Sequence, residues 1–330
     1  MSSSLSVDAC MPAEATDSPL HSHMVKRGHI NVSATKNTSN IYYELYGTGP
    51  DKLVFINGMK ADRQMWEPVV AKLLFRPRYQ CLVYDHRGSG YSDSAGGPLS
   101  YTSSSMATDT KRLIDALGWH KVNVIGASMG GMVALTFACT YPETILTLTL
   151  VAAHAGMTIP PIRGTLRSLS ASFISDPDKR WRRICSSLYP QEFLDLPPPP
   201  DIETSGCKNM LGYCAQVSAR HKKYKKPMPF ASLLGQLGVV FRHYVSPTKL
   251  KLLGKLFSNH QILIITGDQD LVVRPSNSAY IADTIGRDKV TFEVYEGTGH
   301  KLHVQQAHRL VQSIETMIAR VCNLAIDQNE

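Results

Sequence analysis

Ser128 stands at the centre of the run Gly126-Ala127-Ser128-Met129-Gly130, a G-x-S-x-G pattern. An apolar, β-branched segment precedes this run, and a segment rich in Ala, Leu and Phe follows it, which is typical of a strand, a tight turn and a helix. Glycines at both ends let the chain turn sharply, and the serine itself takes a strained backbone conformation. Such a turn lifts the hydroxyl clear of the sheet at a helix N-terminus. We predict that Ser128 is a nucleophile; the alternative is a glycine-rich turn with an inert serine.

A serine hydroxyl attacks only when a base removes its proton, and a carboxylate must orient that base. Two downstream segments provide such groups. The segment 261–275 begins as an apolar strand and then carries Asp268 and Asp270, and the segment 290–303 is an alternating strand followed by His300. Open α/β sheets place their sites beyond the carboxyl ends of their strands, which is where these side chains fall. The three residue types therefore occur in the order serine, acid, histidine.

Four sequence signatures occur in an order that resembles the α/β-hydrolase superfamily: Asn57-Gly58-Met59 after a strand, Asp85 to Ser92, the turn at Ser128, and Gly267-Asp268-Gln269-Asp270 followed by His300. The resemblance covers residues 29–154 and 259–330. It implies an α/β-hydrolase fold with a mostly parallel central sheet flanked by helices. In this family the acid lies three residues after the glycine of the seventh strand, which favours Asp270 as the catalytic acid and leaves Asp268 a structural carboxylate. His300 occupies the family position of the base.

The oxyanion of an acyl-transfer reaction needs two backbone N–H donors. The resemblance assigns these donors to Met129, directly after the nucleophile, and to Met59, in the loop after the third strand. Asn57-Gly58 replaces the commoner His-Gly pair in that loop, as in enol-lactonase-like and aminoacrylate-hydrolase-like members. Because the donor is a main-chain group, this replacement is compatible with activity.

The alternation of strands and helices stops after Ala155 and resumes at Gln261. Proline-broken helical segments fill the interval, and they resemble the helical cap, or lid, that the family inserts between strands 6 and 7. We therefore expect a cap over residues 155–258. Four polar side chains are candidates for substrate contacts: Asn57, His154, Gln236 and His243. For the last three the alternative is internal packing, with their polar groups hydrogen-bonded inside the protein.

The expected cap is strongly basic. It contains 16 basic and 6 acidic residues, so it carries +10 of a chain whose formal net charge is +8. Three interpretations are open: solvated helix faces, attraction of an anionic substrate or an anionic membrane surface, and nucleic-acid binding. The third is not expected, because the sequence has no nucleic-acid recognition motif and no interleaved stacking aromatics.

Residues 1–28 show no periodicity, so we expect a disordered tail. They contain no apolar run typical of a secretory signal, and no stretch of the chain is apolar enough to cross a bilayer. Seven cysteines without regular spacing favour reduced thiols in an intracellular compartment. These features predict a cytoplasmic protein, and no motif implies a cofactor or a metal ion.

The sequence thus predicts a serine hydrolase that cleaves a small or medium-sized ester, lactone or thioester through an acyl-enzyme on Ser128. One alternative is a lipid or acyl hydrolase, or an acyltransferase, that docks at membranes through the basic cap. Perhydrolysis and C–C bond hydrolysis use the same triad, and the fold does not choose among these reactions. A further alternative is a ligand-binding hydrolase homologue with little turnover.

Overall fold

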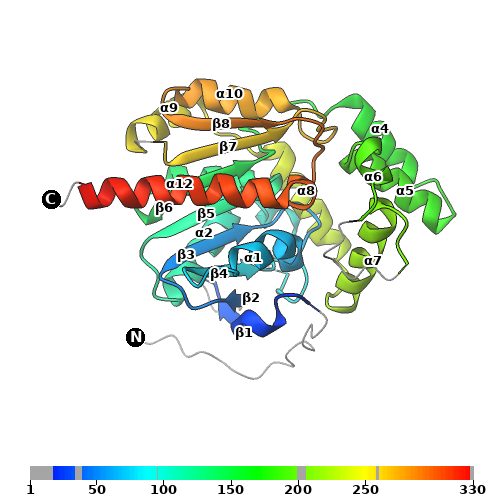
Figure 1. Cartoon of the computed structure of the whole chain (residues 1–330), viewed down its shortest axis with the longest axis horizontal. Helices are drawn as coiled ribbons and strands as arrows, with labels where there is room; N and C mark the ends of the chain where they lie inside the picture. Colours follow the sequence, from blue (N-terminus) through cyan, green and yellow to red (C-terminus); the bar gives the residue numbers. More distant parts are fainter. Residues whose placement is uncertain (1–17, 34–38, 95, 199–205, 258–259, 328–330) are drawn as a thin grey trace.

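The computed structural model describes residues 18–33, 39–94, 96–198, 206–257 and 260–327. An eight-stranded sheet runs through its centre in the order β1-β2-β4-β3-β5-β6-β7-β8 (Figure 1). Strands β1 and β2 are antiparallel to each other, β2 is antiparallel to β4, and all remaining neighbours are parallel. The strands are β1 Met24–Asn31, β2 Asn40–Tyr46, β3 Asp51–Ile56, β4 Tyr79–Tyr84, β5 Val122–Ala127, β6 Ile145–Val151, β7 Ile262–Gly267 and β8 Val290–Tyr295.

Alternate residues of each central strand face opposite layers of helices, as the pleat of a strand requires. In β3, Val54 and Ile56 lie in the apolar cluster shared with α2, α3, α9 and α10, whereas Leu53 and Phe55 lie in the cluster shared with α1 and α12. The predicted fold, a mostly parallel sheet flanked by helices, is confirmed. The helices on the two faces are α1 Glu67–Leu73, α2 Ser103–Ala116, α3 Met129–Thr140, α9 Pro247–Leu256, α10 Pro275–Ile285 and α12 Ala307–Asp327.

The predicted helical insertion lies between β6 and β7. Its remaining helices are α4 Ile162–Ala171, α5 Pro177–Leu188, α6 Gln191–Asp195, α7 Met210–Lys223 and α8 Phe230–Arg242. Helices α4 to α7 gather on one side of the molecule (Figure 1), where Tyr189, Leu194 and Met210 belong to a small apolar cluster of their own. The rest of the chain forms a short helix α11 Leu302–Gln305 and the 3₁₀ turns η1 His21–His23, η2 Arg63–Trp66, η3 Pro98–Ser100 and η4 Pro142–Thr144.

Two expected boundaries differ from the structure. Strand β1 begins at Met24 and pairs with β2, so the expected tail extends too far at residue 28; residues 1–17 lie outside the described residues. Helix α9 packs against α3 and α10, and its Leu250 and Leu253 belong to the main core, so the cap ends before the expected residue 258. Sequence periodicity missed the end of the cap because a helix that joins the core and one that joins a cap carry the same apolar spacing.

No helix in the described parts of the chain is long and apolar enough to span a bilayer. The six cysteines within these parts are free thiols, and Cys10 lies outside them.

Candidate active site

Ser128 occupies a sharp turn between β5 and α3. Its φ of 56° lies in the left-handed region, which is unusual for a residue with a side chain. The two glycines of the motif make room for this turn. A Cβ at Gly126 would lie 2.3 Å from the carbonyl oxygen of Gly130, and a Cβ at Gly130 would lie 2.1 Å from that of Ile56. The serine is therefore held in a strained conformation at the carboxyl end of a central strand, as in a nucleophile elbow.

The structure brings Ser128, His300 and Asp270 into one hydrogen-bonded line, although 172 residues separate the first two. The His300 Nε2 atom lies 3.1 Å from Ser128 Oγ, and its Nδ1 atom lies 2.8 Å from Asp270 Oδ2. Asp270 follows β7 and His300 follows β8, so the parallel strands deliver both side chains to the sheet edge at which Ser128 lies.

The Asp270 carboxylate is fully buried and fixed by its own loop. Its Oδ1 atom accepts hydrogen bonds from the N–H groups of Val272 at 2.7 Å and Val273 at 2.9 Å, which leaves Oδ2 for His300. Asp268 has a different environment, because its Oδ1 atom accepts from the N–H of Thr298 at 3.1 Å. Asp268 therefore ties the acid loop to the loop that carries His300, which fits the structural carboxylate expected for it.

The loop after β3 lies directly beside the nucleophile. A Cβ on Gly58 would lie 3.5 Å from Ser128 Cβ. The N–H of Gly58 donates to the sulfur of Met65, and the N–H of Lys60 donates to Gln236. Within the described parts of the chain, no protein acceptor is recorded for the N–H of Met59, which lies between these two. The Met129 N–H is the first of α3, where helix geometry leaves it without an intrahelical acceptor. Both predicted oxyanion donors are therefore available.

Gln236 has the internal hydrogen bonds of the packing alternative rather than those expected of a substrate contact. Its side chain is completely buried, its Oε1 atom accepts from Lys60 N–H at 2.9 Å, and its Nε2 atom donates to Ser89 Oγ at 2.8 Å. Both ends of the amide are therefore used inside the protein. Lys60 has a left-handed φ of 63°, so Gln236 holds the strained turn directly after Met59. A helix of the insertion thus braces the loop that carries a predicted oxyanion donor.

Asn57 also uses its side-chain N–H group in a hydrogen bond inside the protein. Its Nδ2 atom donates to the main-chain carbonyl of Tyr84 at 2.5 Å. The main-chain carbonyl of Asn57 accepts from His86 Nε2 at 3.0 Å. Burial lowers the pKa of His86 to about 4, so the ring is neutral near pH 7. Asn57 is completely buried and fixes the end of β3 against β4. Its side-chain Oδ1 atom has no hydrogen-bond partner within the described residues, so a substrate contact through this atom stays a prediction.

His154 and His243 form a buried pair whose ring centroids lie 5.7 Å apart. His154 Nδ1 accepts from the N–H of Gly156 at 3.0 Å, and His243 Nδ1 lies 3.2 Å from Ser103 Oγ. Burial lowers the pKa of His154 to about 4, and burial together with the nearby His154 lowers the pKa of His243 to about 3. Both rings are therefore neutral near pH 7, and their contacts support internal packing rather than the expected substrate contacts.

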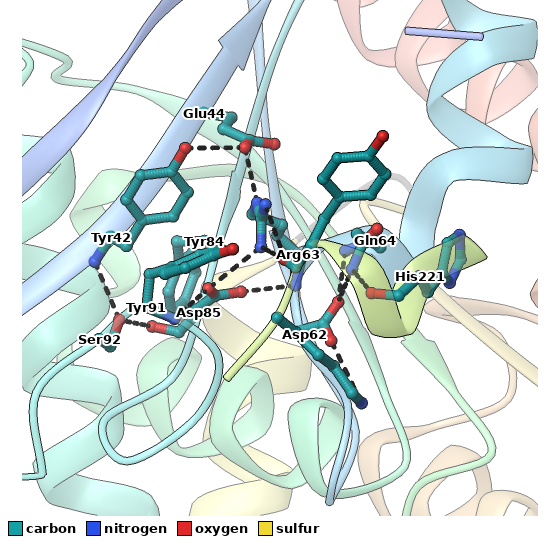
Figure 2. A network of polar contacts seen from close by, with 12 residues as sticks. Tyr42, Glu44, Asp62, Arg63, Gln64, Tyr84, Asp85, Tyr91, Ser92 and His221 are labelled. Atoms are coloured by element: carbon teal, nitrogen blue, oxygen red, sulfur yellow. Dashed lines mark hydrogen bonds and ion pairs between the residues drawn. The ribbon is translucent and has the colours of Figure 1, made fainter. Parts of the chain in front are cut away.

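A buried ion-pair network around Arg63, in the turn that follows the loop 57–62, was not predicted (Figure 2). Arg63 Nε lies 2.6 Å from Glu44 Oε1, and Arg63 Nη1 lies 3.3 Å from Asp85 Oδ2. Asp85 also accepts from the N–H groups of Arg63 and Tyr91. Burial raises the pKa of Asp85 to about 6 although Arg63 acts to lower it. The network fixes η2, which follows the loop 57–62, against strands β2 and β4.

The segment 62–67 is also bound to the end of helix α7 and to a residue just after it. Gln64 Nε2 donates to the carbonyl of His221 at 3.0 Å, and Lys225 Nζ lies 3.4 Å from Asp62 Oδ2. Arg220 forms an ion pair with Glu67 at the start of α1. Part of the basic charge of the insertion is therefore used to hold it to the core. In the described residues, no group of three or more His, Cys, Asp or Glu side chains is arranged to hold a metal ion.

Comparison with known proteins identifies the family of the chain. Residues 52–307 match the sequence profile of the alpha/beta hydrolase fold family, and the chain belongs to that family. The "Putative carbamate hydrolase RutD" of Azorhizobium caulinodans is 35% identical over 113 residues, which are 34% of this chain and 41% of that protein. The chain thus aligns with only about two fifths of the length of the first curated relatives.

Solved structures show the same fold over nearly the whole chain. The meta-cleavage product hydrolase CumD of Pseudomonas fluorescens IP01 aligns with a TM-score of 0.68 at 18% identity, covering 90% of this chain and 98% of that one. The enol-lactonase of Burkholderia xenovorans LB400 aligns with a TM-score of 0.62 at 18% identity, covering 87% of this chain and 99% of that one. The family and the names of these proteins support an enzyme of hydrolase type.

Proposed function

We propose that this protein is a serine hydrolase that cleaves a small or medium-sized ester, lactone or thioester through an acyl-enzyme. The observation that carries the proposal is the line from Ser128 Oγ through His300 to the buried Asp270 carboxylate, with separations of 3.1 and 2.8 Å. These are hydrogen-bond distances between a nucleophile, its base and the group that orients the base.

In the first half of the reaction, Ser128 Oγ attacks the acyl carbon while His300 Nε2 takes the hydroxyl proton. The carbonyl π electrons move onto oxygen, and the resulting oxyanion accepts hydrogen bonds from the N–H groups of Met59 and Met129. The tetrahedral intermediate then collapses, the bond to the leaving group breaks, and His300 gives its proton to the departing alkoxide or thiolate. Asp270 keeps the His300 Nδ1–H oriented and stabilises the imidazolium.

In the second half, His300 takes a proton from water, and the hydroxide attacks the acyl carbon of the ester on Ser128. A second tetrahedral intermediate forms with the same two oxyanion donors. Its collapse releases the carboxylic acid, and His300 returns the proton to Ser128 Oγ. The two N–H donors matter because they are aimed at charge that develops only during the reaction, and each such donor contributes about 3 kcal/mol to lowering the barrier.

The names of the relatives guide the choice of substrates to test. Those names include a carbamate hydrolase and an enol-lactonase, both of which act at acyl carbons. A panel of p-nitrophenyl esters, lactones, thioesters and carbamates of increasing acyl length should therefore be screened with wild type and with Ser128→Ala. We expect turnover with at least one of these classes, and we expect it to disappear in the variant.

Turnover that survives in Ser128→Ala would contradict the mechanism. Binding of panel members without turnover by the folded wild type would instead support a ligand-binding homologue. Transfer of the acyl group to an added alcohol or amine, at a rate above that of hydrolysis, would assign the same acyl-enzyme to a transferase.

A further inference from the structure

Helices α4 and α5 form a hairpin that projects at one side of the molecule, away from the sheet (Figure 1). The two helices pack against each other, and Arg167 Nη1 donates to the carbonyl of Ser186 at 2.6 Å. The start of α4 is also seated on the core, because a Cβ at Gly164 would lie 1.7 Å from the carbonyl oxygen of Leu271. Leu271 directly follows Asp270, so the hairpin adjoins the loop that carries the predicted catalytic acid.

The side of α4 that faces away from α5 is apolar and exposed. Its large side chains are spaced by four, three and four residues, which places them on one face of a helix. They are Ile162, Leu166, Leu169 and, just past the helix end, Phe173, with exposed fractions of 66, 61, 58 and 88%. We call these four residues the α4 stripe. Single exposed apolar side chains are common, but a continuous row of them marks a surface that binds something.

The hairpin that carries the stripe is basic. Residues 162–188 contain six basic and two acidic side chains, so the hairpin carries a formal charge of +4. Five of the basic side chains are exposed and have no ion pair within the described parts of the chain: Arg163, Lys179, Arg180, Arg182 and Arg183. Helix α7 differs, because Arg220 at its end pairs with Glu67 of the core. The basic charge of the insertion thus divides into residues that bind the core and residues of the hairpin that face solvent.

We propose that the α4–α5 hairpin binds the surface of an anionic lipid bilayer. The α4 stripe would enter the boundary between headgroups and acyl chains, and the exposed basic side chains of the hairpin would attract it to the anionic headgroups. An amphipathic helix with an apolar face and basic flanks has the composition of a helix that lies in a membrane interface. Binding of this kind does not depend on the chemistry of Ser128.

The charge also argues against a second copy of this chain as the occupant. A symmetric dimer built on the stripe would bring two hairpins of charge +4 together. Like charges at such an interface repel, whereas an anionic bilayer attracts them.

The test is co-sedimentation of the full chain with vesicles of pure phosphatidylcholine and with vesicles that also contain phosphatidylserine. Two variants address the hairpin: Leu166→Ser/Leu169→Ser removes half of the stripe, and Arg182→Glu/Arg183→Glu reverses two exposed charges of α5. Helix α9 supplies matched controls on the opposite side of the molecule (Figure 1) in Leu252→Ser/Leu256→Ser and Lys251→Glu/Lys255→Glu, whose side chains are also exposed. All proteins are checked for folding by thermal melting, and Ser128→Ala is included to separate binding from hydrolysis.

We expect wild type and Ser128→Ala to bind the anionic vesicles equally, with binding that weakens as salt is raised, and to bind the neutral vesicles weakly. Each arginine near an anionic surface changes the partition coefficient about fivefold, so the double charge reversal should lower it at least about 25-fold. The partition coefficient of the stripe variant should fall at least about tenfold. The partition coefficients of the two α9 controls should stay within about twofold of wild type, apart from the general effect of net charge.

Three results would overturn the proposal. The first is folded wild type that does not bind anionic vesicles at low salt. The second is equal loss of binding in the hairpin variants and their α9 controls, which would show that the stripe has no special part. The third is a dimer in light scattering that the stripe variant dissociates, which would assign the face to a second copy.

Discussion

Replacing Gln236 with leucine tests whether the insertion holds the loop that carries Met59, a predicted oxyanion donor. Leucine has a similar size but removes two hydrogen bonds, one to Lys60 N–H at 2.9 Å and one to Ser89 Oγ at 2.8 Å. Each such bond contributes about 1 kcal/mol, so the free energy of unfolding should fall by about 2 kcal/mol. The left-handed turn at Lys60 loses its side-chain restraint, and the adjacent Met59 N–H becomes free to leave its position.

The catalytic effect has an upper limit set by one oxyanion donor, which contributes a factor of about 10² to 10³ in kcat. Because the turn is loosened rather than removed, we expect kcat to fall between about tenfold and that limit, with KM changed less than about twofold. The unchanged KM follows because the oxyanion exists only after attack, so its donors act on the transition state and not on bound substrate.

The assay is steady-state hydrolysis of the best ester found in the panel, together with urea unfolding of the same samples. Ser89→Ala is the matched control, because it removes the second hydrogen bond of Gln236 and leaves the one to Lys60. This control should lose about 1 kcal/mol of stability and keep kcat within about twofold of wild type. A folded Gln236→Leu protein with unchanged kcat, or a Ser89→Ala protein that loses as much kcat, would refute the reasoning.

Three further perturbations probe other parts of the site. Asp270→Asn should lower kcat about 10⁴-fold at pH 7 with little change in melting temperature, because the carboxylate that orients His300 is lost. Single-turnover kinetics measure this loss, and a loss below about tenfold would contradict Asp270 as the acid. Gly130→Ala should lower the melting temperature by several degrees, because the new Cβ would lie 2.1 Å from the carbonyl oxygen of Ile56; unchanged melting would show that the elbow is not so close-packed. The free energy of unfolding should also fall as the pH drops from about 6.5 to about 4, because the unfolded chain gains a proton on His243 that the folded chain, with the pKa lowered to about 3, does not gain. Urea unfolding across this range should show that the free energy of unfolding depends less steeply on pH in His243→Asn. An unchanged dependence would exclude this ring as a contributor.

The catalytic side chains could be placed from the sequence because each belongs to a local pattern. Ser128 lies within five residues that fix its turn, and Asp270 and His300 each follow a strand closely. Parallel strands end at one edge, so the sheet alone brings these separate patterns together. The mostly parallel architecture was predictable from another local pattern, the alternation of strands and helices along the chain.

The supports of the site could not be predicted in this way. Gln236 meets Lys60 across 176 residues, and the sequence gives no spacing that links a glutamine of an apolar helix to a backbone N–H in another loop. Arg63 likewise meets Glu44 and Asp85 only after β2 and β4 have paired. These contacts depend on how the insertion and the sheet pack, which local periodicity does not encode.

The α4 stripe shows the limit of periodicity itself. The spacing of Ile162, Leu166, Leu169 and Phe173 is visible in the sequence and predicts an apolar helix face. An apolar face is normally expected to pack inward, whereas here the opposite face, with Gly164 and Ala171, is the buried one. Which face packs was decided by α5 and by the loop at Leu271, and both are tertiary partners.

The central claim is that His300 activates Ser128, and the most direct measurement is the intact mass of the protein after exposure to a fluorophosphonate probe. We predict one adduct per wild-type chain, located at Ser128 by peptide mapping, with no adduct in Ser128→Ala and a strongly reduced labelling rate in His300→Ala. A folded wild type that takes up no probe, or an adduct that persists in Ser128→Ala, would contradict the claim.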